Sequence, residues 1–321
     1  MLQYFLILFW FSLRTGGIIH VTHFNLGINL GFAVKRWPEP QAWAKFIREE
    51  LELDFVQFTY DLLDPWWPED VIREMAAEIR QVSQDWGITI HSAFVGLANY
   101  TYNGLLHPKP AGRATMLEWW KRAIRVAALL GAREMGGPLG GMSYSDAGDP
   151  NKVKERYETV LDTVSLLSKL AHEAGLGAFL IEPTPLKREF PHTPEQAKKM
   201  LADLAGRTKT PIKFVLDIGH AGYQPLYGSS AGCQPWLDLI HDQVGMFHLQ
   251  NTDFHSDSHW GWPEERGKLN LDTYWKEIIR NNLENIPVVL EVFYPYEMDD
   301  DQVRANIISS VKYIKNSLLA V

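Results

Sequence analysis

The chain has 321 residues, a length that suits one large α/β domain. Its composition, 46% apolar and 22% charged, is typical of a soluble globular protein that can bury a sizeable core. The net charge of −8 and the pI near 5.8 provide no basic field for a phosphate backbone, so no nucleic-acid partner is expected. The single cysteine, Cys233, excludes an internal disulfide and is compatible with a reducing cytoplasm, where we expect the protein to reside.

The first residues differ from the rest of the chain. Residues 2–13 (LQYFLILFWFSL) are almost entirely apolar, but the stretch is too short to span a bilayer comfortably. No Lys or Arg precedes it and no Ala-x-Ala-like site follows it, although a secretory signal would have both. We therefore expect residues 1–21 to be an N-terminal extension, with a weak signal or membrane anchor as the alternative. Residues 22–321 are expected to form the folded domain, without stable membrane association.

Short apolar stretches alternate with helical patterns along the remaining chain. Apolar residues at helical spacing predict helices at 68–87 and 151–175, each ending at a glycine, and at 193–206 and 301–319. Several of the short stretches are almost continuously apolar, as in parallel strands that are covered on both faces. The predicted strands are residues 23–30, 53–60, 88–94, 131–137, 177–183, 212–218, 244–251 and 286–293.

Eight strands that alternate with helices, without a linker or a low-complexity break, predict a single (β/α)8 barrel. The competing architecture is an open doubly wound sheet, which more often begins with a glycine-rich turn. Residues 27–34, GINLGFAV, do not match the G-x-G-x-x-G pattern of such a turn. A barrel places its functional side chains at the C-terminal ends of the strands, where the loops to the helices begin.

Metal-binding side chains stand at the ends of the last four predicted strands. These are Glu182, Asp217, His248 and Glu291. Carboxylates that face one another repel, and a divalent cation removes that conflict. Three carboxylates and one imidazole suit Mn²⁺, Mg²⁺ or Co²⁺, and they also accept Zn²⁺, although no thiolate demands it. The sequence therefore predicts one divalent metal ion, Mn²⁺ first, held by these side chains.

Two histidines are candidates for contacts to a ligand. His220 lies three residues beyond Asp217, where it could reach a bound substrate or support the metal ligands. His91 is expected to end the third strand and to line the pocket, with a structural role at the barrel mouth as the alternative.

Several motifs together resemble the sugar isomerase and epimerase superfamily of xylose isomerase-like TIM barrels. This superfamily includes ketose 3-epimerases, inosose dehydratases and, more distantly, endonuclease IV. The resemblance covers residues 22–318 and implies an isomerase that acts on a small sugar or sugar phosphate. The motifs are IEPTP (181–185), LDIGH (216–220), HLQNTD (248–253), PEERGKLNLD (263–272) and VLEVF (289–293).

The resemblance to the ketose 3-epimerases implies roles for individual residues. All four strand-end residues would bind the metal, and Glu182 and Glu291 would also move the proton on opposite faces of the substrate. His220 would contact substrate oxygens. Glu189 would do so too, although its distance from Glu182 along the chain differs by one residue from the family pattern.

This sequence departs from the epimerase pattern in two places. No arginine follows His248 closely, and Gln57 stands where many relatives have a glutamate. Residues 31–40 and 56–65 resemble, more faintly, the branch that acts on erythrulose 1-phosphate. That resemblance makes Lys35 and Lys268 candidate contacts for a phosphate, with solvated surface charges as the alternative.

We therefore expect metal-dependent epimerisation of a ketose or ketose phosphate at carbon 3 through an enediolate. An aldose–ketose isomerase or an inosose-type dehydratase would use the same chemistry up to that point. An endonuclease IV-like phosphodiesterase would need a cluster of zinc ions and a basic groove, which the acidic pI disfavours. A non-catalytic sugar-binding barrel is the remaining alternative. The expected partner is a small sugar or sugar phosphate, and a homo-oligomer is compatible with the sequence.

Overall fold

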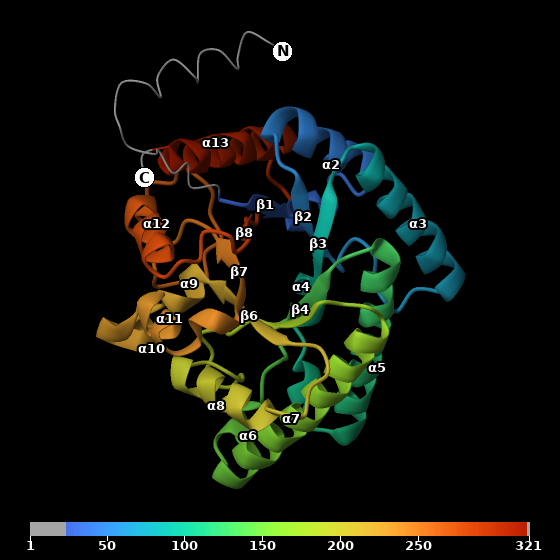
Figure 1. The fold of residues 1–321 in the computed structure, drawn as a ribbon, viewed down its shortest axis with the longest axis vertical. Coiled ribbons are helices and arrows are strands. Elements are labelled where there is room, and N and C mark those ends of the chain that lie inside the picture. Colours follow the sequence, from blue (N-terminus) through green and yellow to red (C-terminus); the bar gives the residue numbers. More distant parts are fainter. Residues whose placement is uncertain (1–23, 320–321) are drawn as a thin grey trace.

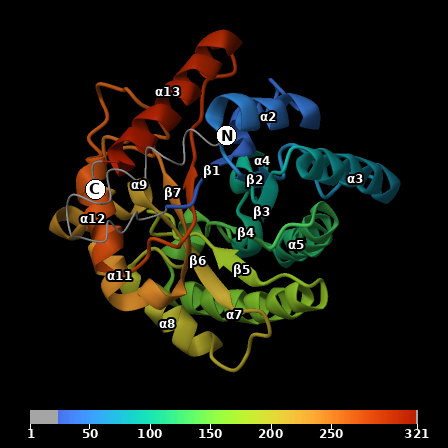
Figure 2. The same cartoon turned by 45° about the horizontal axis from the view of Figure 1, so that its top comes forward.

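The computed structural model describes residues 24–319, so the predicted extension at residues 1–21 lies outside the described part of the chain. The eight strands form a closed parallel barrel in chain order, and helices surround it (Figures 1 and 2). The first strand closes the barrel by pairing with the last, with Ile28 opposite Leu290. The predicted single (β/α)8 barrel is confirmed.

Each strand is short and falls within its predicted stretch. The strands are β1 (Leu26–Asn29), β2 (Phe55–Thr59), β3 (Thr89–Phe94), β4 (Glu134–Gly137), β5 (Ala178–Ile181), β6 (Ile212–Asp217), β7 (Val244–Leu249) and β8 (Val288–Leu290).

The longer predicted helices are also present, as α3, α7, α8 and α13. Gly87 and Gly175 follow α3 and α7 with φ of 64° and 81°, a left-handed conformation that ends a helix and that glycine adopts without a steric penalty. The α-helices are α2 (Pro40–Phe46), α3 (Glu69–Asp85), α4 (Leu97–Tyr100), α5 (Pro110–Leu130), α6 (Tyr144–Ala147), α7 (Pro150–Glu173), α8 (Pro194–Leu204), α9 (Ile218–Ala221), α10 (Gln224–Tyr227), α11 (Gln234–Ile240), α12 (Leu271–Arg280) and α13 (Asp300–Leu318). Short helical turns are η1 (Leu30–Ala33), η2 (Ile47–Leu51), η3 (Gly104–Leu106), η4 (Gly228–Ser230) and η5 (His241–Gln243).

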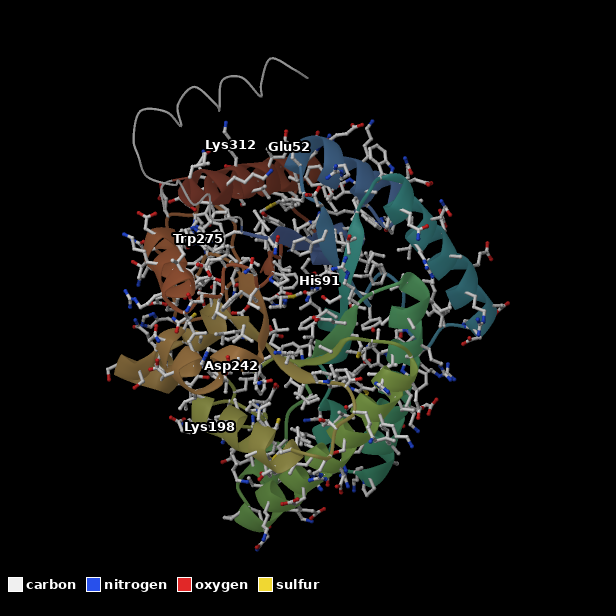
Figure 3. All side chains as sticks on the ribbon, in the orientation of Figure 1. Glu52, His91, Lys198, Asp242, Trp275 and Lys312 are labelled. Carbon is white, nitrogen blue, oxygen red and sulfur yellow. The ribbon has the colours of Figure 1, made fainter. Side chains whose placement is uncertain are left out.

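Apolar side chains pack in two layers. The larger cluster lies between the strands and the outer helices; Trp275 of α12, for example, is fully buried, and its indole donates to Ser317 of α13 at 2.8 Å (Figure 3). The smaller cluster comes from β3 and β5 to β8 and includes Phe94, Leu180 and Met246. Because both faces of the strands are buried, polar side chains at the strand ends stand out from their apolar surroundings. Between residues 24 and 319, no helix has both the length and the apolarity needed to cross a membrane.

Glu134, the first residue of β4, carries a buried carboxylate oxygen that has no hydrogen-bond partner among the described residues. Burial raises the pKa of Glu134 from 4.5 to about 7, against the opposing charges of Lys213 and Arg133. The unfolded chain therefore releases this proton at lower pH than the folded protein does, so stability falls as the pH rises from about 4.5 to about 7. We expect E134Q to raise the free energy of unfolding by about 2 kcal/mol at pH 8 and to change it little at pH 5.

Urea unfolding of E134Q at the two pH values measures this effect. The matched control is E74Q, because Glu74 is exposed on α3. A gain of the same size at pH 5 and pH 8, or a similar gain in E74Q, would contradict the assignment to the buried carboxyl group.

Candidate active site

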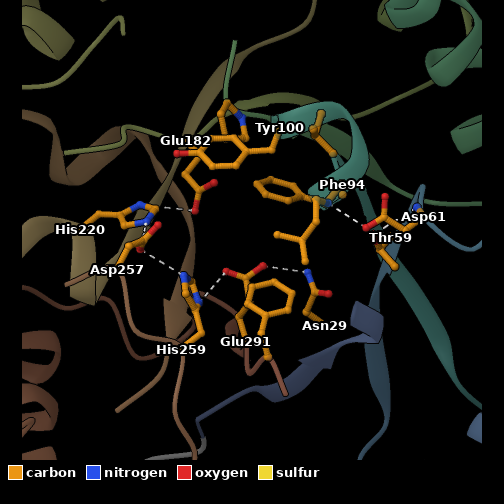
Figure 4. A pocket seen from close by; sticks show the side chains of 15 residues that line it. Asn29, Thr59, Asp61, Phe94, Tyr100, Glu182, His220, Asp257, His259 and Glu291 are labelled. Atoms are coloured by element: carbon orange, nitrogen blue, oxygen red, sulfur yellow. Dashed lines mark hydrogen bonds and ion pairs between the residues drawn. The ribbon is translucent and has the colours of Figure 1, made fainter. Parts of the chain in front are cut away.

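A cavity of about 210 Å³ lies at the mouth of the barrel (Figure 4). The C-terminal ends of the strands supply its polar wall, including Asn29, Glu182 and Glu291. An apolar wall faces them, and it is formed by Phe94, Val95, Leu97, Tyr100, Pro138 and Phe293. This combination of an apolar wall and a few convergent polar groups is typical of a small-molecule site.

The four predicted metal ligands converge at the strand ends, and two of them, Glu182 and Glu291, line the cavity. Asp217 ends β6, His248 lies near the end of β7, and Glu182 and Glu291 directly follow β5 and β8. One donor atom from each lies within 4.8 Å of the other three. His248 Nδ1 is 3.1 Å from Glu182 Oε1 and 2.9 Å from Glu291 Oε2. Ligand oxygens bind Ca²⁺, Mg²⁺ and similar ions at about 2.0 to 2.6 Å, so donors grouped this closely fit one divalent ion.

Gln57 forms a hydrogen bond with the second ring nitrogen of His248. His248 Nε2 lies 2.9 Å from Gln57 Oε1, which also accepts a hydrogen bond from Asn29 Nδ2 at 2.6 Å. Gln57 Nε2 in turn donates to Ser92 Oγ at 3.2 Å. This network makes Nε2–H of His248 the donor and leaves Nδ1 to face the two glutamates. Metal-binding histidines commonly hold their second nitrogen in this way.

Asp217 is completely buried and fixed by polar neighbours. Gln250 Nε2 donates to both of its carboxylate oxygens, at 2.7 and 2.8 Å, and the backbone N–H of His220 donates to Oδ1 at 2.7 Å. These hydrogen bonds orient the carboxylate, and the His220 ring lies beside it, with Nδ1 3.9 Å from Oδ1. A cation at the strand ends would further balance the negative charge of this buried carboxylate.

The carboxylates around the cavity raise the pKa of its histidines. Burial lowers the pKa of His248, but Glu291 and Glu182 outweigh this effect and raise it to about 10. Burial likewise lowers the pKa of His259, and Asp257 and Glu291 are the main groups that raise it to about 9. The cavity therefore stabilises positive charge, whether on imidazolium groups or on a bound cation.

The two glutamates differ in their pKa shifts. Burial raises the pKa of Glu182, and the hydrogen bond from His248 reverses only part of this shift. Burial also raises the pKa of Glu291, but the charge and the hydrogen bond of His248 outweigh burial and hold this pKa below its usual value.

His220 lines the cavity beside the predicted metal ligands. Its Nδ1 lies 3.2 Å from the Pro183 carbonyl oxygen, and its Nε2 lies 3.0 Å from Asp257 Oδ1. Burial lowers the pKa of His220, while Asp217 and Asp257 raise it well above the usual value.

Several cavity residues, including Asn29 and Asp61, were not identified from the sequence, and two more of them are Asp257 and His259. They belong to the long loop after β7, where Asp257 Oδ1 lies 3.3 Å from His259 Nε2. Asp217, His220 and His259 form a second group whose donor atoms could hold a cation. The sequence feature that could have identified Asp257 and His259 is the polar run HSDSH at residues 255–259. It lies in the loop that follows a predicted strand.

Glu189 and His91 are not among the residues that line the cavity. Glu189 is buried and accepts a hydrogen bond from Thr184 Oγ1 at 2.7 Å. His91 does not end β3, because the strand continues to Phe94, and Phe94 lines the cavity instead. The His91 ring packs on Phe55 with 5.6 Å between centroids, and burial with the charge of Arg133 lowers its pKa to about 4 (Figure 3).

Lys35 and Lys268 also lie outside the cavity wall. The Lys35 ammonium packs over the ring of Tyr296, 4.6 Å from its centroid. Lys268 is exposed, and its backbone N–H donates to the carbonyl oxygen of Thr252 at 2.8 Å.

A family model described as the xylose isomerase-like TIM barrel matches residues 47–316, and the chain belongs to this family. The resemblance that the motifs indicated is thereby confirmed. A curated relative, D-erythrulose 1-phosphate 3-epimerase of Brucella abortus, is 22% identical over 294 residues, covering 90% of this chain and 94% of that protein. Together with the family, this relative places the chain among the isomerase-class enzymes.

Solved structures show the same fold. A Rhodospirillum rubrum protein, described as a candidate xylose isomerase, is 37% identical with a TM-score of 0.89, covering 92% of this chain and 99% of that chain. D-psicose 3-epimerase of Clostridium cellulolyticum is 15% identical with a TM-score of 0.67, covering 92% of this chain and 99% of its own.

Proposed function

We propose that this protein is a metal-dependent epimerase that inverts carbon 3 of a ketose or ketose phosphate. The observation that carries the proposal is the convergence of one donor atom from each of four strand ends within 4.8 Å at the cavity. The name of the Brucella abortus relative, a 3-epimerase, supports the same reaction. Glu182, Asp217, His248 and Glu291 would hold one divalent ion, and their three carboxylates and one imidazole favour Mn²⁺.

A divalent ion at these residues would polarise the substrate carbonyl and make the neighbouring carbon acid easier to deprotonate. Glu182 and Glu291 lie on opposite sides of the cavity, which suits proton transfer on the two faces of a substrate (Figure 4). One carboxylate takes the proton from carbon 3 to give the enediolate, and the other returns a proton to the opposite face. The number of protons is conserved, and the configuration at carbon 3 is inverted.

Other side chains would hold the reacting groups in place. Asn29 Nδ2 donates to Glu291 Oε1 at 3.0 Å, which fixes the orientation of that carboxylate. His220 would act on the substrate through Asp257, which it holds at 3.0 Å and whose carboxylate can accept hydrogen bonds from substrate hydroxyl groups. Phe94 and Phe293 present apolar surface that can cover the C–H face of a sugar and exclude water.

An aldose–ketose isomerase is the second candidate, favoured by the description of the 37% identical Rhodospirillum rubrum protein. Both reactions begin by removing a proton from a carbon next to the ketose carbonyl group, which is carbon 3 for the epimerase and carbon 1 for the isomerase. Product analysis separates them, because an epimer keeps the position of its carbonyl group and an isomer does not.

The test is a screen of the Mn²⁺-loaded protein against ketoses of four to six carbons, free and 1-phosphorylated, in deuterated water. The proposal predicts solvent deuterium at carbon 3 with the carbonyl position unchanged, and no incorporation after the metal is removed with a chelator. A product with a shifted carbonyl group would assign the isomerase instead. If no sugar shows either incorporation or a shifted carbonyl group, both candidates are contradicted.

Replacing Gln57 tests the support of His248 independently of turnover. Q57L removes the acceptor for Nε2–H, so we expect the affinity for Mn²⁺ to fall by about 10- to 100-fold. Q57E restores an acceptor at the same position and is expected to bind Mn²⁺ more tightly than Q57L. Isothermal titration calorimetry measures both values, and equal affinity of Q57L and the unmodified protein would rule out this role.

A further inference from the structure

We infer that the cavity takes an unphosphorylated ketose, a neutral polyol, in preference to a sugar phosphate. This inference rests on the proposed function and narrows its substrate class, in contrast to the phosphorylated substrate in the name of the Brucella abortus relative. Two observations support it: the cavity wall carries carboxylates but no lysine or arginine among the described residues, and backbone N–H groups around the cavity already donate to side-chain oxygens.

Within residues 24–319, no lysine or arginine lines the cavity. The wall instead contains the carboxylates of Asp61, Glu182, Asp257 and Glu291, and the buried Asp217 adjoins it. Asp61 and Asp257 lie on opposite sides of the cavity, so a phosphate at either end of a bound sugar would meet a carboxylate (Figure 4). One divalent ion balances two of these five negative charges, and no lysine or arginine among the described wall residues balances the others.

The histidines on the wall do not supply a free anion site. Asp257 Oδ1 lies 3.0 Å from His220 Nε2 and 3.3 Å from His259 Nε2, so one carboxylate faces the outer nitrogen of both rings. Each ring also has a second carboxylate beside its inner nitrogen, at 3.8 Å between His220 Nδ1 and Glu182 Oε1 and at 3.5 Å between His259 Nδ1 and Glu291 Oε2. A positive charge on either imidazole is therefore balanced by carboxylates of the protein. A phosphate would have to displace Asp257 to reach them.

Backbone N–H groups at helix starts are a common alternative for binding phosphate without lysine or arginine. At the cavity, backbone N–H groups in the first turns of α4, α9 and η1 already donate hydrogen bonds to side-chain oxygens. Asp61 accepts from two N–H groups of α4, at 2.7 and 3.1 Å. Asp217 Oδ1 accepts a hydrogen bond of 2.7 Å from the backbone N–H of His220 in α9. Asn29 Oδ1 accepts one of 2.7 Å from the backbone N–H of Gly31 in η1. A phosphate would therefore compete with built-in oxygen atoms at each of these positions.

A neutral sugar matches the same wall without this conflict. Carboxylates only accept hydrogen bonds, and sugar hydroxyl groups donate them. Glu182 and Asp257 offer such acceptors on one side of the cavity, while Phe94, Leu97 and Phe293 offer apolar surface for C–H groups. The wall is thus complementary to a polyol and repels a dianion.

Matched pairs of each ketose and its 1-phosphate test the inference on the Mn²⁺-loaded protein. We expect kcat/KM for deuterium exchange, and the affinity in calorimetric titration, to favour the free sugar by about 100-fold. Equal or higher values for the phosphate would overturn the inference while leaving the epimerase proposal intact. If no sugar shows exchange, the proposed function fails, and the relative affinities alone then support or overturn the inference.

A charge variant tests the cause of the preference. Leu97 lines the cavity and is 40% exposed, so L97K adds an ammonium group at the rim at low structural cost. We expect L97K to shift the ratio of phosphate to free-sugar affinity by tenfold or more toward the phosphate. L97Q, similar in length but uncharged, is expected to keep the original ratio. The same ratio in L97K and L97Q would overturn the assignment of the preference to charge.

Discussion

E182Q and E291Q are each expected to abolish epimerisation, with kcat lower by about 10² to 10⁴-fold. Glutamine keeps the volume and one oxygen atom of the side chain, but its amide cannot take up the proton from carbon 3. Because the two carboxylates would serve opposite faces of the substrate, the variants are also expected to lose deuterium exchange on opposite epimers. Proton NMR in deuterated water, started from each epimer separately, measures this loss.

Two controls separate a loss of catalysis from a loss of folding. Circular dichroism and unfolding curves show whether each variant is folded, and E74Q on the surface of α3 controls for a general effect of glutamate replacement. If both variants epimerise at the rate of the unmodified protein, the acid and base are other groups.

D217N is expected to remove most of the stability that Mn²⁺ gives to the folded protein. A cation that binds only the folded state adds about 2.7 kcal/mol to the free energy of unfolding at 100 times its dissociation constant. Asparagine keeps an oxygen that can accept the 2.7 Å hydrogen bond from the His220 N–H, but it removes the negative charge that binds the ion. The amide nitrogen of D217N cannot accept a hydrogen bond from Gln250, which donates to both carboxylate oxygens, so each protein is compared with its own metal-free form.

Urea unfolding with and without Mn²⁺ checks this expectation. D238N is the matched control, since Asp238 is exposed on α11, and it is expected to keep the full gain. A gain in D217N as large as in D238N would show that Asp217 does not bind the ion.

The barrel and the carboxylates at its strand ends could be predicted from the sequence because the strands are buried on both faces. Parallel strands that are buried on both faces are apolar throughout, so Asp217 and Glu291 at the ends of their runs are conspicuous. The closed barrel then brings these ends to one mouth, which is why their convergence followed from the fold alone.

The exact end of a strand depends on details that periodicity does not encode. His91 was expected at the end of the third strand, but β3 continues to Phe94. The register of β3 against β2 also shifts between Val56 and Gln57. The role of Gln57 depends on which way its side chain points inside the barrel, and the path of the loop with Asp257 has no repeating pattern to follow.

One divalent ion is expected to bind at the ends of β5 to β8, and anomalous diffraction from crystals grown with Mn²⁺ would locate it. We expect an anomalous peak about 2.0 to 2.6 Å from oxygen atoms of Glu182, Asp217 and Glu291 and from Nδ1 of His248. No peak at these atoms, or a single peak bound by Asp217, His220 and His259 instead, would contradict this expectation.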